Sequence, residues 1–221
     1  MRLTQIDKTT LPKALARFAS YLQPDPQSTT TAANAFGHFA RTAAAFDAPF
    51  DTSAHREAAC TLAERFGIPT IDQAPAAAFS WDGKFLRTRS EASVLVHEIA
   101  HWQLAPADRR LLPDFGLGAG PETGRVTEAD AARRVTDSVK EREELLASLL
   151  GILWEAALGQ PAIHAFIEQN WLEAWERPAA GDQFRRTIDE LSARGLIGSD
   201  GVPCDAAVDG AVDAAVVSDP L

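Results

Sequence analysis

Hydrophobic side chains recur along most of this chain every three or four residues, the spacing of amphipathic helices. Pro24 and Gly67 supply stop signals behind two of the resulting segments, and Pro161 supplies a start signal before another. The long helix that follows residue 121 has two alternative starts, at Thr127 or at Asp137. The pattern predicts helices over 11–22, 29–46, 53–66, 127 or 137 to 158, 161 to about 175, and 182–194.

One segment has a different pattern. Residues 78–81 and 84–88 lie on either side of the pair Asp82 and Gly83, an arrangement typical of a β-hairpin with a two-residue type I′ turn. The hairpin immediately precedes an apolar helix that carries residues 97–101, and it either borders a cleft or simply covers that helix. We therefore expect a mainly helical α+β fold in which this helix lies beside a small antiparallel sheet.

The 221 residues, 46% of them hydrophobic, suit one ordinary core. Residues 1–198 are predicted to form a single domain. From residue 199 to residue 221 the chain is rich in Ala, Val and Asp without an amphipathic period, which predicts an acidic, disordered tail.

The formal charge of −10 disfavours nucleic acid or an anionic membrane as the main partner and favours a basic protein substrate or a neutral small molecule. Cys60 and Cys204 lie far apart and form no Cys-x-x-Cys motif, so neither a disulfide framework nor a cysteine zinc site is expected. With no signal-peptide pattern and no run of 18 apolar residues, the expectation is a cytoplasmic protein. Nothing in the sequence indicates an oligomeric state.

The chemistry of the chain is concentrated in residues 97–101, which read His-Glu-Ile-Ala-His. His97 and His101 are four residues apart, so on a helix they share one face and can bind one divalent metal. Glu98 lies about 100° around the same helix, where it can act on a metal-bound water without being a ligand. The flanking residues are apolar, which predicts that the helix is buried. We therefore expect a zincin-like metal-binding helix beside the small sheet, which makes residues 1–198 a metal-binding domain.

Two histidines need a third ligand, for which a carboxylate on a neighbouring helix is the usual choice. Glu144 is the preferred candidate, because Ser148 and Gly151 follow it on the same face and would allow close helix packing. Glu141, on the same face, and Glu143, on an adjacent face, remain alternatives. An acidic helix N-terminus in solvent would give the same pattern.

Residues 97–102, the following Arg109–Leu112 and the segment Asp114–Gly116 resemble the metal-binding core of the elongation factor P hydroxylases, over roughly residues 94–161. The resemblance implies a metal-dependent hydroxylase with a zinc-protease-like site of two His and one Glu, acting on a modified lysine of a translation factor. It implies that His97 and His101 are ligands, and alignment through residues 157–161 places the glutamate at Glu144. Residues 117–121 lack the aromatic residues of that family, so the substrate does not carry over.

A second resemblance is to the ImmA/IrrE metallopeptidases, and it rests on residues 63–69, the hairpin and the Glu-rich helix. It implies a minimal zinc peptidase in which the hairpin edge aligns the scissile peptide.

Three functions thus remain open. A hydroxylase would hold Fe(II), with Glu98 tuning the site or shuttling protons, whereas a peptidase would hold Zn(II), with Glu98 as the general base. A metal-stabilised binding module without turnover would not need Glu98. Three further residues are candidates to stabilise developing negative charge, although each is expected to be structural or solvated: Arg109, Arg110 and His164.

Overall fold

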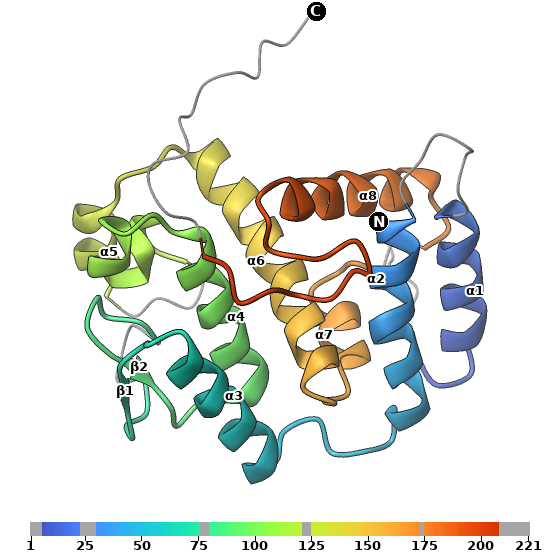
Figure 1. Cartoon of the computed structure of the whole chain (residues 1–221), viewed down its shortest axis with the longest axis horizontal. Helices are drawn as coiled ribbons and strands as arrows, with labels where there is room; N and C mark the ends of the chain where they lie inside the picture. Colours follow the sequence, from blue (N-terminus) through green and yellow to red (C-terminus); the bar gives the residue numbers. More distant parts are fainter. Residues whose placement is uncertain (1–5, 23–29, 76–79, 121–124, 173–174, 208–221) are drawn as a thin grey trace, which may run out of the picture.

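A computed structural model describes residues 6–22, 30–75, 80–120, 125–172 and 175–207. Helix α6 runs through the middle of the molecule, with α3, α4 and the strands on one side of it and α1 and α2 on the other (Figure 1). In chain order the elements are α1 (Leu11–Tyr21), α2 (Thr31–Ala40), η1 (Arg41–Ala45), α3 (Ser53–Arg65), β1 (Thr70–Ile71), β2 (Leu86–Arg87), α4 (Ala92–Leu104), η2 (Arg109–Leu111), η3 (Pro113–Gly116), α5 (Val126–Ala132), α6 (Asp137–Ala157), α7 (Ile163–Glu168) and α8 (Pro178–Ala193).

Helix α6 begins at the later of its two predicted starts. The Thr136 side chain accepts a hydrogen bond from the Val139 backbone N–H. Asp137 places a negative charge in the first turn, where it interacts favourably with the helix dipole. Residues near Thr127 form the separate helix α5. Each fully buried leucine stabilises the fold by roughly 1.5–3 kcal/mol. The buried apolar side chains of α6 are Leu146, Ala147, Leu149, Leu150, Ile152, Leu153 and Trp154.

Helix α4 packs closely against α6, and a glycine sets the distance between them. A Cβ atom at Gly151 would lie 3.4 Å from the Cα atom of His97, so the two backbones approach as closely as an alanine would permit. This agrees with the expectation that small residues on α6 allow close packing. The contact brings the acidic face of α6 over the histidine face of α4.

The expectation of an antiparallel sheet is wrong. Strands β1 and β2 pair in parallel, with Thr70 opposite Leu86 and Ile71 opposite Arg87. In the described part of the chain, antiparallel pairing beside β2 is confined to one bridge from Leu86 to Trp81. A strand of two residues is too short for an alternation of apolar and polar residues to be recognised in the sequence.

The predicted type I′ turn is also wrong. Gly83 has a φ of 86°, but Asp82 does not have the positive φ that such a turn requires. Instead, the Asp82 carboxylate accepts hydrogen bonds from the backbone N–H groups of Lys84 and Phe85, which builds a longer loop. Residues 78 and 79 of the predicted hairpin lie outside the described residues.

The C-terminal segment differs from the predicted tail. Gln103 on α4 donates hydrogen bonds to the backbone oxygens of Cys204 and Ala206, at 3.0 and 2.6 Å. Gly201 lies directly on α2, where an added Cβ would be 2.4 Å from the Ala35 nitrogen. Residues 199–207 are therefore bound to the domain (Figure 1), and the rest of the predicted tail lies outside the described residues.

The other helices follow the prediction with shifted ends, and α8 begins at Pro178 rather than at residue 182. The second helix stops at Ala40 and continues as the 3₁₀ helix η1, and α7 ends at Glu168 before Trp171. Among the described residues, no helix combines the length and the apolar character needed to cross a bilayer. The structure is thus mainly helical with a small sheet, as expected, apart from the direction of the strands.

The α4–α6 contact gives a test at Gly151. Alanine fits at ordinary contact distance and improves helix propensity, so Gly151→Ala should change the free energy of unfolding by less than about 1 kcal/mol. Gly151→Leu should destabilise the protein by about 2–4 kcal/mol, because the side chain must displace the α4 backbone. Urea unfolding would measure both. Wild-type stability of the leucine variant would contradict the close contact.

Candidate metal centre

Two independent features fix the helix that carries the histidines. The backbone N–H of Ala92, in the first turn of α4, is satisfied by the Asp51 carboxylate at 3.1 Å. Further along, Leu95, Val96 and Ile99 are fully buried in the core. The rotation of α4 is therefore set by its apolar face, which places the face with His97 and His101 toward α6.

The three predicted ligands come together at this contact. The Nε2 atoms of His97 and His101 lie 3.0 Å apart, and Glu144 Oε2 lies 3.6 Å from the first and 3.3 Å from the second. Ligand atoms at about 2.0–2.1 Å from a tetrahedral metal are about 3.3 Å from one another. The donor set and its spacing therefore fit a divalent metal, and all three ligand atoms lie within 4.8 Å of each other.

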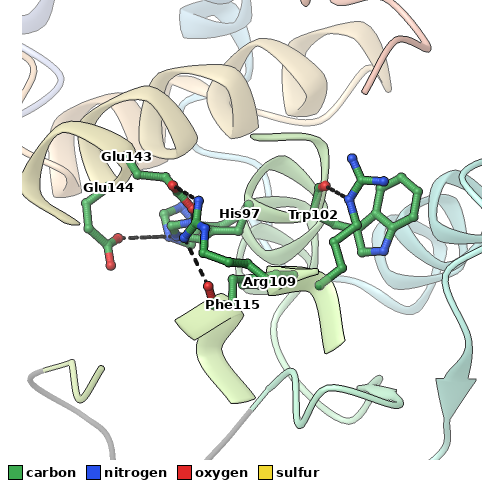
Figure 2. Close-up of polar contacts among 8 residues, drawn as sticks. His97, Trp102, Arg109, Phe115, Glu143 and Glu144 are labelled. Carbon is green, nitrogen blue, oxygen red and sulfur yellow. Dashed lines mark hydrogen bonds and ion pairs between the residues drawn. The ribbon is translucent and has the colours of Figure 1, made fainter. Parts of the chain in front are cut away.

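The site is buried on one side and open on the other. The side chain of His101 is 5% exposed, whereas that of His97 is 26% exposed and that of Glu144 is 43% exposed. Figure 2 shows Glu144 reaching the histidines from α6. Of the three candidate ligands, His101 would thus hold a metal from the protein interior, whereas His97 and Glu144 lie at the accessible side of the site.

Electrostatics favour a cation at this point. Burial would raise the pKa of Glu144, but the two adjacent imidazoles outweigh it and lower that pKa below its usual range. Burial would lower the pKa of His101, but the carboxylates of Glu143 and Glu144 outweigh it and raise that pKa to about 10. Without a metal, a proton on His101 therefore supplies the positive charge that the two carboxylates stabilise.

Glu98 differs from the other acidic groups. Desolvation, together with the smaller effects of the charges on Asp114 and Glu144, raises its pKa to about 7 against the opposing effect of the two imidazoles. The side chain lines the same cleft as His97 and Glu144. A carboxyl group that titrates near neutral pH can both accept and release a proton, as general acid–base chemistry requires.

Behind His101 lies a buried ion pair that sequence reasoning did not identify. Glu143 Oε1 is 3.7 Å from His101 Nδ1, and the other oxygen of Glu143 accepts a hydrogen bond from Arg109. Arg109 also donates to the backbone oxygen of Phe115 at 3.0 Å (Figure 2). Both residues were candidates in the sequence, but not as a pair. The ion pair forms because η2 folds back onto α6, a contact that helical spacing does not predict.

The ring of His101 is held by an aromatic stack. Phe115 lies on it with ring centroids 5.6 Å apart, and Trp81 stacks on the other side of Phe115 at 5.7 Å. Asp114 and Phe115 adopt left-handed backbone conformations, with φ of 45° and 52°. Such conformations in residues other than glycine cost of order 1–3 kcal/mol and persist where the surroundings impose them, often at functional sites.

The metal centre opens into a cleft of about 2180 Å³. Its walls come from α3, the segment before α4, α4 itself, the loop around Asp114 and α6. Carboxylates outnumber lysine and arginine side chains along these walls. The acidic residues include Glu57, Glu64, Glu91, Glu98, Asp114, Glu141, Glu144 and Glu168.

Other candidate residues lie outside the metal cluster. Glu141 is an exposed residue of the cleft wall and Glu155 is buried, and neither belongs to the His–His–Glu group found in the described part of the chain. Arg110 donates to the Trp102 backbone oxygen at 2.8 Å and stacks on its ring. His164 stacks on Phe46. His38 and His55 contact backbone oxygens.

Comparisons of the chain with protein-family models, with curated proteins and with solved structures found no match.

The geometry predicts one metal ion per chain. Titration of the metal-free protein with Zn(II) should raise the free energy of unfolding by about 2.7 kcal/mol when free Zn(II) is 100 times the dissociation constant. His97→Ala should weaken binding at least about 100-fold, because it removes one of three ligands. Glu141→Gln, on the same helix as Glu144, is the matched control and should bind normally. Equal binding by His97→Ala would refute the site.

A second prediction concerns the buried carboxyl of Glu155. Desolvation, together with the charge of Glu168, raises its pKa from 4.5 to about 8. The folded state therefore keeps a proton that the unfolded state releases, and stability is lost as pH rises from about 4.5 to about 8. Glu155→Gln should remove a loss of roughly 3–4 kcal/mol between pH 5 and pH 8, as measured by urea unfolding at the two pH values. An unchanged pH profile would show that Glu155 ionises normally.

Proposed function

We propose that this protein is a metal-dependent enzyme that hydroxylates a protein side chain, with His97, His101 and Glu144 holding Fe(II). The observation that carries the proposal is the arrangement of three donor atoms within 4.8 Å of each other beside a fourth carboxyl group, Glu98, with a pKa near 7. The similarity of residues 97–116 to the elongation factor P hydroxylases gives the reaction type.

In this proposal the metal supplies dioxygen activation at a site of two histidines and one carboxylate. One oxygen atom enters a C–H bond of the substrate and the other leaves as water, with two electrons from an external reductant and two protons. Glu98 would hold and deliver protons at its carboxyl oxygen, since its pKa lets it carry one at neutral pH. Glu144 and the histidines stay as ligands.

The cleft supports a protein as the substrate. Its volume of about 2180 Å³ exceeds the 300–1,000 Å³ typical of sites for drug-sized ligands. Its excess of carboxylates favours a cationic segment, which agrees with the expectation of a basic partner. A translation factor in the cytoplasm remains the proposed class of substrate, by resemblance.

A zinc metallopeptidase of the minimal zincin type is the second candidate, because a carboxyl group with a pKa near 7 also suits a general base for hydrolysis. The sheet gives this candidate less support than expected. Strand β2 is bonded to β1 on one side and to residues 80–81 on the other. The described residues thus offer only a very short strand edge for aligning an extended peptide.

The first experiment measures metal content after anaerobic purification and oxygen consumption after Fe(II) loading with ascorbate as reductant. Bound iron and oxygen uptake that falls about 10²- to 10⁴-fold in Glu98→Gln would support the hydroxylase. Tightly bound zinc, no oxygen uptake and Glu98-dependent cleavage of fluorescent casein would instead support the peptidase. Metal binding with no activity that depends on Glu98 would point to a binding module without turnover.

A further inference from the structure

The buried groups behind the metal centre leave one contact unmade. His101 Nδ1 and Glu143 Oε1 are both buried, and neither has a hydrogen-bond partner within the described residues. They face each other at 3.7 Å, which is beyond hydrogen-bond distance. Burying two polar atoms without partners is costly, so a pair left this close points to a bond that forms in another state of the protein.

Metal binding is a state that would require this bond. A histidine that binds a metal through Nε2 must carry its proton on Nδ1, and such a proton is usually donated to a carboxylate or a carbonyl. In this structure the Nε2 atoms of His97 and His101 face each other at 3.0 Å, so one proton can lie between them. A metal would displace that proton and leave Nδ1 of His101 as the donor toward Glu143.

Arg109 holds Glu143 in position for this role. Its guanidinium donates to the Glu143 oxygen that does not face His101, and the other guanidinium nitrogen donates to the Phe115 backbone oxygen. Phe115 in turn stacks on the ring of His101. One buried side chain therefore connects both contacts that orient His101, the carboxylate at its edge and the aromatic ring on its face.

From this geometry we infer that Glu143, fixed by Arg109, is a positioning residue that sets the tautomer and orientation of His101 for metal binding. The inference rests on the proposed metal site and adds to it two residues that are not ligands. Partners of this kind typically change metal affinity by about 10- to 100-fold when replaced.

Glu143→Gln tests the tautomer directly. Arg109 has only donors, so it keeps the amide oxygen, and the amide NH₂ then faces His101 Nδ1. Nδ1 must act as the acceptor, which places the proton on Nε2 where the metal should bind. We expect Zn(II) affinity, measured against a competing chelator, to fall about 10- to 100-fold. The visible spectrum of bound Co(II) should change as well, because His101 is weakened as a ligand.

Glu143→Gln also disturbs a buried ion pair and could reduce folding. The double variant Arg109→Met with Glu143→Leu removes both charges together, a replacement that folded proteins often tolerate, and it leaves His101 without either support. Its far-UV circular dichroism and melting temperature should stay close to wild type while Zn(II) affinity falls about 10- to 100-fold. Glu141→Gln, the exposed control on the same helix, should match wild type in all measurements.

The outcomes separate the two claims. Wild-type Zn(II) affinity and Co(II) spectra in both Glu143 variants would overturn the role of Glu143 and leave the metal site intact. Failure of the wild-type protein itself to bind Zn(II), Co(II) or Fe(II) would overturn the proposed function and this inference with it.

Discussion

The close contact between α4 and α6 is the constraint on which the rest of the site depends. Glu144 lies more than forty residues from the histidines along the chain, so its carboxylate reaches them only if the two helices pack at short range. Gly151 permits that range, since a larger side chain would meet the backbone at His97. The buried leucines of α6 and the apolar face of α4 then provide the stabilisation that holds the helices together.

Placing several carboxylates around two imidazoles has an electrostatic consequence. Glu98, Glu143 and Glu144 surround the histidines, and Arg109 is a buried cation that pairs with Glu143 rather than with the ligand atoms. The local charge is therefore balanced only when something positive occupies the space between the ligand atoms. A proton supplies part of this positive charge. A divalent metal would supply more of it and would also accept the lone pairs of all three ligand atoms.

The loop around Asp114 shows how the fold orients a ligand without touching the metal position. Its backbone takes conformations that L-residues rarely adopt, which places the Phe115 ring flat against His101 and its carbonyl oxygen against Arg109. The same residues, Asp114–Gly116, are part of the sequence on which the resemblance to hydroxylases rests. The structure thus gives this segment a role other than substrate contact. It holds the ring of His101, which is a candidate metal ligand.

The sequence by itself determined the helices, because a period of three to four residues is visible over segments as long as α6 and α4. It also indicated the three candidate ligands, since His97 and His101 share one helical turn and Glu144 lies on a face with small residues. Tertiary structure alone decided the strand direction, because two-residue strands at Thr70 and Leu86 have no detectable period. It alone brought Glu143 and Arg109 together beside His101 as well. Helical spacing tells which side chains share a face, but only the packing of separate elements determines which faces meet.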